Sequence, residues 1–230
     1  MVFSNRRRSA MTAAIAGLAL ATTPAPAGAA HVSRKTTPAC GHAKSRLLLA
    51  DHQAEVYEAP IFVLSTEALG IFGCAYRTGR QHELGGPPAQ AAEGGPEKES
   101  GVLDPTLTGT VVAYAKSYYS PYGLTRNLVV VRDLRTGRLL HEVPDGTPVK
   151  PEPGSEGLGP VDAIVVKSDG AVAWIVRTDP EEGMYQVHAL DQTGSRVLST
   201  GSDIAPSSLA LAGSTLYWTQ GGEPHSATLN

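Results

Sequence analysis

Charged residues are scarce in this 230-residue sequence, at 18%, and they include no concentrated basic segment beyond the N-terminus. The formal net charge is −3, from 19 Lys and Arg against 22 Asp and Glu. Residues 1–29 hold three of the arginines and no acid, so the rest of the chain carries 16 basic and 22 acidic side chains, a net of −6. Such a chain is unsuited to sequence-independent nucleic-acid binding and to anionic membrane surfaces. We therefore expect no nucleic-acid partner.

Long hydrophobic runs are also lacking. The apolar segment Ala10–Ala21 is shorter than the roughly 20 residues that span a bilayer, and it follows the arginines at 6–8. Ala27-Gly28-Ala29 fits the small-x-small rule for cleavage. The pattern predicts a secretory signal peptide at residues 1–29, and a mature chain that lies outside the cell or on the envelope exterior without membrane insertion. Arg7-Arg8 also resembles a twin-arginine export signal, so the export route stays open.

Only two cysteines occur, Cys40 and Cys74. In an oxidising compartment a lone pair predicts one disulfide, which here closes a loop of about 35 residues. The alternative is a reactive thiol or a metal-binding pair, but the C-x-x-C spacing typical of such sites is absent.

Aromatic residues make up only 6% of the chain, whereas 25 glycines and 17 prolines favour turns and strands. The turn at residues 135–138, Arg-Thr-Gly-Arg, has counterparts at residues 77–80 and 193–196. Arg80, Arg138 and Arg196 are thereby spaced 58 and 58 residues apart. Asp133 and Asp191 open two of these turns, and Ala75 stands in the first. A fixed period of this length indicates a repeat architecture.

A second marker recurs in the same units. A small or apolar residue followed by a large aromatic precedes each turn, or the place of that turn, with aromatics at Tyr57, Tyr114, Trp174 and Trp218. Stacked sheets fill equivalent core positions in this way, so we interpret these aromatics as core residues. The alternative interpretation is a platform on which carbohydrate stacks.

Each unit thus has room for four short strands, which is the plan of a β-propeller blade. We predict an all-β, propeller-like array of about four antiparallel blades over residues 46–230, preceded by an N-terminal strap at residues 30–45. After Trp218 the fourth unit has room for only one more strand. The array is therefore either incomplete or closed by a strand from residues 31–45. Gly- and Pro-rich stretches at residues 85–100 and 144–160 are predicted as loops between units.

The turn Asp133–Arg138 resembles the turn between the third and fourth strands of quinoprotein-type propeller repeats. Residues 209–218 resemble the first hairpin of secreted, uncharacterised propeller-like proteins from high-GC bacteria. The resemblance covers about residues 46–230 and implies a fold rather than an activity. The tryptophan that commonly follows the Gly turn in quinone-binding repeats is missing, so no cofactor is carried over.

Motifs that carry chemistry are largely missing. The seven histidines show no metal-ligand spacing, and no G-x-S-x-G elbow occurs. We therefore assign no catalytic residue, metal or cofactor. The alternative function, a hydrolase or lyase acting on an extracellular polymer in a propeller channel, would use an acidic pair such as Asp162 and Glu182, which no spacing rule supports.

The most distinctive exposed segment that we predict is Ser117–Gly123, which contains Tyr118, Tyr119 and Tyr122. Tyr, Ser and Gly are typical of adaptable binding loops, although the tyrosines could instead pack on a neighbouring blade. The sequence thus favours an exported, non-enzymatic binding or scaffold protein, whose partner is an unknown extracellular protein or polymer.

Overall fold

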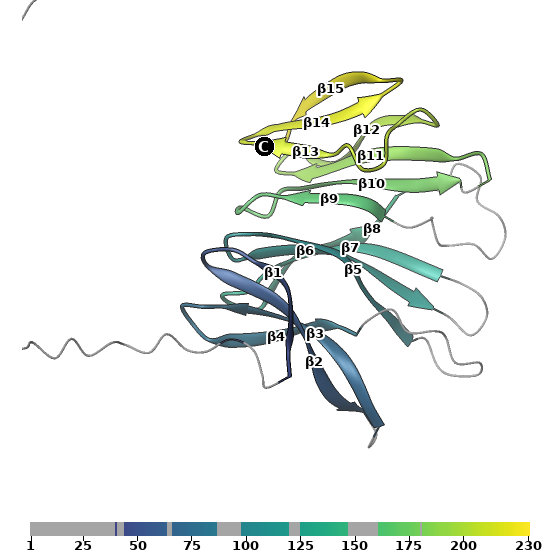
Figure 1. The fold of residues 1–230 in the computed structure, drawn as a ribbon. Helices are drawn as coiled ribbons and strands as arrows, with labels where there is room; N and C mark the ends of the chain where they lie inside the picture. The colour runs from purple at the N-terminus through teal and green to yellow at the C-terminus, as the bar shows by residue number, and fades with distance from the viewer. Residues whose placement is uncertain are drawn as a thin grey trace, which may run out of the picture. The chain divides into compact units, whose positions relative to one another are not determined.

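The computed structural model describes residue 40 and residues 44–63, 66–86, 98–119, 125–146, 161–179 and 181–230. These residues form four antiparallel sheets (Figure 1). The first sheet comprises β1 (Arg46–Ala50), β2 (Ala54–Val63), β3 (Thr66–Ala75) and β4 (Arg80–Gly85). The second comprises β5 (Lys98–Thr108), β6 (Val111–Tyr119), β7 (Thr125–Asp133) and β8 (Arg138–Pro144). The third comprises β9 (Val161–Val166), β10 (Val172–Asp179), β11 (Met184–Asp191) and β12 (Gly194–Gly201), and the fourth comprises β13 (Ala210–Ala212), β14 (Thr215–Gln220) and β15 (Glu223–Thr228).

Every sheet is a simple meander in which strands pair in chain order. The predicted all-β array of four consecutive antiparallel sheets, each of three or four strands, is confirmed. No helix in the described part of the chain is long and apolar enough to cross a membrane. The predicted signal peptide at residues 1–29 lies outside the described residues, as does most of the strap at residues 30–45.

The repeated turns lie where the 58-residue period predicts them. Arg80 begins β4, Arg138 begins β8, and Arg196 lies in β12. Gly137 has a φ of 76°, in the left-handed region that favours glycine. A Cβ there would also lie 2.4 Å from Cε1 of His82 in the preceding sheet, so two separate constraints select glycine.

Hydrophobic cores lie between consecutive sheets. One buried cluster combines residues of the first and second sheets, a second combines the second and third, and a third combines the third and fourth. Within the described residues, no buried cluster joins the first sheet to the fourth. The strand that could close the array was expected from residues 31–45, most of which lie outside that part of the chain.

The four marker aromatics all lie in the second strand of their sheets and are at most 5% exposed. Tyr114, Trp174 and Trp218 each belong to the cluster shared with the preceding sheet. The core interpretation is therefore confirmed, and the carbohydrate-stacking alternative is wrong because all four rings are buried.

The first sheet has no preceding sheet for its aromatic to face. Tyr57 instead clusters with Phe72 and with Cys40 and Cys74, which form a disulfide with Cα atoms 5.8 Å apart. The rings of Tyr57 and Phe72 stack with centroids 5.7 Å apart. The disulfide thus attaches the N-terminal strap to the side of β2 and β3 that a further sheet would otherwise cover.

The loops between sheets are shorter than the sequence indicates in one case. Residues 85–100 are predicted as a loop, yet β5 already begins at Lys98 and its first residues pair with the end of β6. The antiparallel partner thus extends the strand into a segment whose composition alone indicates no structure.

Candidate functional site: a cleft on the first strands

The first strands of the second, third and fourth sheets provide one continuous surface. β9 contacts both β5 and β13. The hydroxyl of Thr108 in β5 donates a hydrogen bond of 2.9 Å to the carbonyl of Val166 in β9, across 58 residues of sequence. One repeat is thereby joined to the next at equivalent positions, which fixes the spacing of the two strands.

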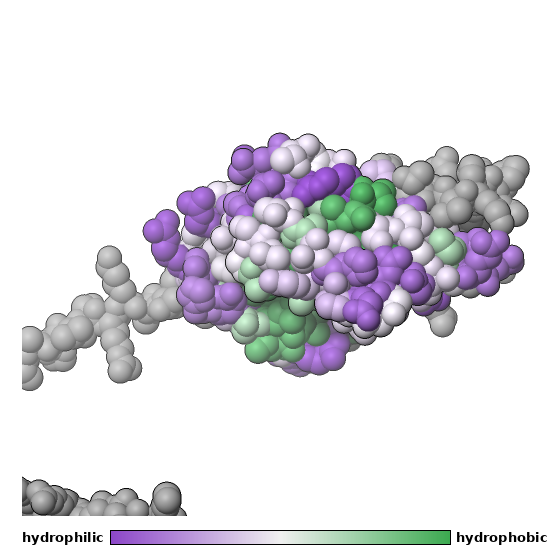
Figure 2. All heavy atoms as spheres, turned by 90° about the horizontal axis from the view of Figure 1, so that it is seen from above, coloured by the Kyte–Doolittle hydropathy of each residue, from purple (hydrophilic) through white to green (hydrophobic). Residues whose placement is uncertain are grey.

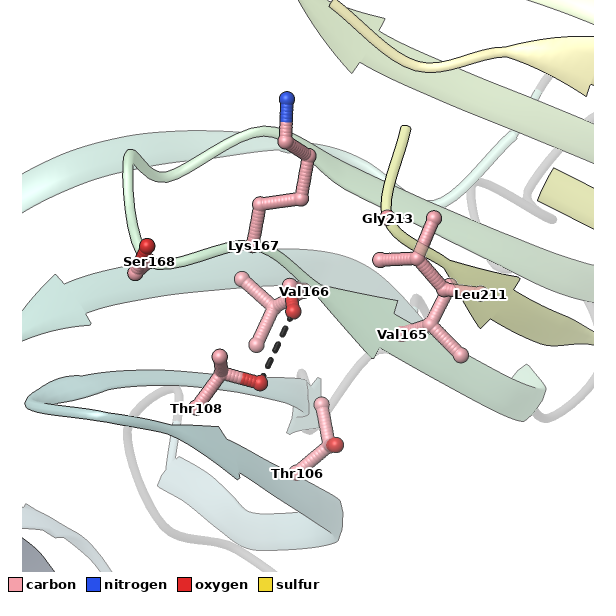
Figure 3. Close-up of a pocket in the computed structure, with 8 residues that line it drawn as sticks. All are labelled: Thr106, Thr108, Val165, Val166, Lys167, Ser168, Leu211 and Gly213. Atoms are coloured by element: carbon pink, nitrogen blue, oxygen red, sulfur yellow. Dashed lines mark hydrogen bonds between the residues drawn. The ribbon is translucent and has the colours of Figure 1, made fainter. Parts of the chain in front are cut away.

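A cleft of about 430 Å³ opens on this surface (Figure 3). Its lining combines aliphatic, hydroxyl and amino groups from Thr106, Thr108, Val165, Val166, Lys167, Ser168, Leu211 and Gly213. Val165 and Leu211 lie on one side of the cleft and Thr106 and Thr108 on the other. Pockets of this size with a few polar groups on apolar walls are suited to a small ligand or one unit of a polymer.

Lys167 supplies the positive charge of the cleft. Its ammonium group donates to the carbonyl of Leu229 over 3.1 Å and pairs with Asp169 at the same distance. Burial alone would raise the pKa of Asp169. The N–H of Ala171 and the nearby Lys167 together outweigh burial, so the pKa is lowered overall. Asp169 and the carbonyl of Leu229 thus hold the ammonium group, which points away from Thr106 and Thr108 (Figure 3).

Two carboxyl groups lie toward the other end of the same strands. Burial raises the pKa of Asp162 in β9, and Asp104 in β5 raises it further, while Arg177 lowers it. Burial also raises the pKa of Asp104. Arg177 lies 3.8 Å from Asp162 and its guanidinium group covers the ring of Tyr185, 5.6 Å from the centroid. A raised pKa is the direction that general-acid catalysis by a carboxyl group requires.

The structure does not bring together the acidic pair considered from the sequence. Asp162 neighbours Asp104 and Arg177, whereas Glu182 lies exposed in the turn between β10 and β11, with its N–H bound to the side chain of Asp179. Sequence reasoning missed Asp104 because it occupies an irregularity in the pairing of β5 with β6, between Leu103 and Thr106, with φ of 46°. No motif marks that bulge.

The predicted tyrosine site falls partly outside the described residues. Tyr118 and Tyr119 are the last residues of β6, where their main chains pair with Arg126 and Thr125 of β7. Tyr122 lies in the hairpin beyond, outside the described residues. The hairpin does connect the second and third strands of its sheet, as the sequence predicts.

Comparison with known proteins provides little further information. No family model matches the sequence, and a search of curated proteins finds no match. Among solved structures, a GH43 beta 1,3 galactosidase is similar with a TM-score of 0.33 and 12% sequence identity, over 75% of this chain and 38% of that one. The chain therefore spans well under half of that protein, and a likeness this low supports no statement about individual residues.

Metal binding is not indicated in the part of the chain that the structure describes. No group of three or more His, Cys, Asp or Glu side chains there could hold a metal ion. The lining of the cleft on β5, β9 and β13 combines hydroxyl and amino groups with aliphatic side chains.

Proposed function

We propose that the protein is an exported, non-enzymatic binding or scaffold protein that holds an extracellular protein or polymer at the cleft on β5, β9 and β13. The observation that carries this proposal is the composition of the cleft. Three successive sheets each contribute residues to it, and the described lining contains no carboxyl group that could act as an acid or a base. Strands β5, β9 and β13 hold Thr106, Thr108, Val165, Val166 and Leu211, and the turns after β9 and β13 hold the rest of the lining.

Three further features support the location and the kind of partner. A signal-like N-terminus and a disulfide fit an oxidising, extracellular environment. A net charge of −6 beyond residue 29 disfavours nucleic acid. The face in Figure 2 carries mostly hydrophilic and neutral side chains, with hydrophobic ones confined to small separate areas. That face lacks a broad hydrophobic area that could form an apolar interface. This favours a partner that is bound in a cleft.

A blocking substitution tests the role of the cleft. Thr106→Tyr places a ring in the cleft, whereas the control Ser226→Tyr adds the same ring to the exposed strand β15. Immobilised wild-type protein and both variants are incubated with culture supernatant and solubilised wall polymers. We expect the wild type and the control to retain the same species and the blocked variant to retain at least tenfold less. Equal retention by all three proteins would exclude the cleft as the contact surface.

A hydrolase or lyase is the second candidate, favoured by the neighbouring carboxyl groups of Asp104 and Asp162. Release of new reducing ends from a retained polysaccharide measures this activity. Activity that disappears in Asp104→Asn and Asp162→Asn but persists in Glu182→Gln would establish an enzyme and overturn the non-enzymatic proposal. Capture without any release of ends supports binding alone.

We retain the tyrosine hairpin as a second proposed contact surface. The triple substitution of Tyr118, Tyr119 and Tyr122 to Ser should weaken a captured partner by roughly 1–3 kcal/mol while leaving the melting temperature nearly unchanged. A fall in stability of several kcal/mol would instead show that the rings pack on a neighbouring sheet.

A further inference from the structure

A second cleft, of about 480 Å³, lies among the turns of the first and second sheets. Four turns contribute to it, those that follow β1, β3, β5 and β7. Most of its polar side chains can donate hydrogen bonds. Its lining residues are His52, Gln53, Ala75, Tyr76, Arg77, Thr110 and Arg135. Two guanidinium groups at repeat-equivalent positions, Arg77 and Arg135, give this cleft its positive charge.

The equivalent turns of the second and third sheets each contain a carboxylate of their own. Asp133 accepts bonds from the N–H of Arg135 at 2.9 Å, from Thr136 at 2.9 Å and from Thr110 at 3.0 Å. Burial alone would raise the pKa of Asp133, but these donors outweigh burial and lower the pKa overall, so the group is ionised. The N–H and hydroxyl groups of this turn are therefore arranged around a negative charge.

The third turn repeats the arrangement with a stronger ion pair. Asp191 accepts from the N–H and the hydroxyl of Thr193 at 2.9 and 2.6 Å, and Arg196 binds both its carboxylate oxygens at 2.8 and 2.9 Å. The guanidinium group of Arg196 holds the pKa of Asp191 far below its usual range. Here the arginine charge is neutralised inside the turn.

The first turn has the donors without the carboxylate. Ala75 occupies the position of Asp133, since it pairs with Arg80 as Asp133 pairs with Arg138. Ala75 lines the cleft and Thr78 turns its hydroxyl to the carbonyl of Ala75 at 3.3 Å. Arg77 forms no ion pair with the described residues. In the second and third sheets this turn contains an aspartate carboxylate, whereas in the first sheet Ala75 provides no negative charge.

The neighbouring charges leave this positive character in place. Arg135 lies 3.6 Å from Asp133, whose oxygens are already taken by shorter bonds from the main chain and hydroxyls. Two further acids lie beside the cleft. Asp51 accepts the N–H of Gly109 at 3.0 Å and pairs with His52, and Glu55 accepts the hydroxyl of the lining residue Tyr76 at 3.3 Å. The N–H of Gly109 is the main cause that lowers the pKa of Asp51.

We propose that this cleft binds an anionic oxygen group, a carboxylate or a phosphate carried by an extracellular ligand, which takes the place of the aspartate missing at Ala75. Arg77 and Arg135 provide guanidinium donors suited to a carboxylate or phosphate. Gln53, whose amide nitrogen lies 2.9 Å from Nε2 of His52, occupies the repeat position of Thr110 in the next sheet. Gln53 corresponds to Thr110 because their carbonyls accept the equivalent N–H groups of Tyr76 and Leu134, at 2.9 and 2.7 Å. This site is separate from the cleft on β5, β9 and β13.

Calorimetric titration of the full chain with trigalacturonate and with tripolyphosphate tests the proposal and distinguishes the two sources of charge. We expect saturable binding of at least one probe, weakened when salt is added. Arg77→Gln should weaken it at least tenfold, because Arg77 is the guanidinium without an internal partner. Ala75→Asp should abolish it, because the variant supplies its own carboxylate to the turn.

Arg46→Gln is the matched control, since it removes one arginine charge at the far end of β1, where Arg46 pairs with Glu58. It should bind as the wild type does. Binding that is equal in Arg77→Gln and in the control, or no binding of either probe to the wild type, overturns the proposal. Thr106→Tyr is titrated with the same probes and should bind them as the wild type does. This control separates the outcome from that of the first cleft.

Discussion

Asp145 and His188 are buried ionisable residues between the second and third sheets, 2% and 5% exposed. The carbonyl of Asp145 accepts a hydrogen bond from the indole N–H of Trp174, whose ring stacks on His188 with centroids 5.1 Å apart. Burial raises the pKa of Asp145 from 3.8 to about 7 and lowers the pKa of His188 from 6.5 to about 4. Both groups are therefore neutral in the folded protein at mildly acidic pH.

The two shifts act on stability in opposite directions. Between pH 4 and 7 the unfolded chain has already lost the proton of Asp145, so stability falls as pH rises. Between pH 4 and 6.5 the unfolded chain binds a proton at His188 that the folded protein excludes, so this contribution rises with pH. Each is of the order of a few kcal/mol, at about 1.4 kcal/mol per pKa unit, and the two largely cancel.

Substitution of either residue should expose the contribution of the other. In Asp145→Asn the free energy of unfolding should rise between pH 4.5 and 6.5, whereas in His188→Gln it should fall over the same range. Urea denaturation at half-unit pH steps measures both profiles beside that of the wild type. Parallel profiles for the wild type and Asp145→Asn would show that the Asp145 pKa is not raised by folding.

The sequence predicted the role of residues that occupy a fixed place in the repeat. It did not predict residues whose pKa depends on contacts between sheets. Tyr114 and Trp174 were interpreted as core residues because a fixed place in each unit needs a filler of similar size. Asp145 and His188 obtain their shifted pKa values from burial between sheets. No local pattern reports such burial.

Among the elements, β3 carries the disulfide, which lies at the outer side of the first sheet. Cys40 is joined to Cys74 in β3, a residue that is completely buried, and the cluster around them covers Tyr57 to 1% exposure. A further sheet would cover this face in the middle of the array, as the second sheet is covered by the first. The sequence predicted the disulfide from composition, but only the structure shows that it covers the end of the array.

Removal of the disulfide should destabilise the protein in two ways. Cys40→Ser with Cys74→Ala loses the constraint on a 34-residue separation, about 3–4 kcal/mol, and frees Cys40 from the cluster around Tyr57. Guanidinium denaturation followed by tyrosine fluorescence measures the loss. Natively purified wild-type protein, once unfolded, should show no titratable thiol. Two titratable thiols would contradict the disulfide.

At the scale of the whole molecule, the arrangement of the cores determines how many sheets a local substitution destabilises. Each buried cluster belongs to two consecutive sheets, so stability is expected to be a sum of sheets and of interfaces between neighbours. The fold class and the sheet number could be predicted from the period. The coupling between sheets could not, because it depends on which sheets share a core.

Trp218→Ala tests this coupling at the interface between the third and fourth sheets. Trp218 is 5% exposed, belongs to the cluster shared by these sheets, and stacks on His225 with ring centroids 5.7 Å apart. Its removal should cost about 3–5 kcal/mol. Because the first sheet shares no buried cluster with the fourth among the described residues, amide hydrogen exchange should accelerate in β9–β15 and stay slow in β2 and β3.

The control Tyr217→Ala removes the adjacent aromatic side chain of the same strand, which is 43% exposed, and should leave exchange nearly unchanged. Equal acceleration in all four sheets after Trp218→Ala would instead mean that the array unfolds as one cooperative unit, as a closed ring would.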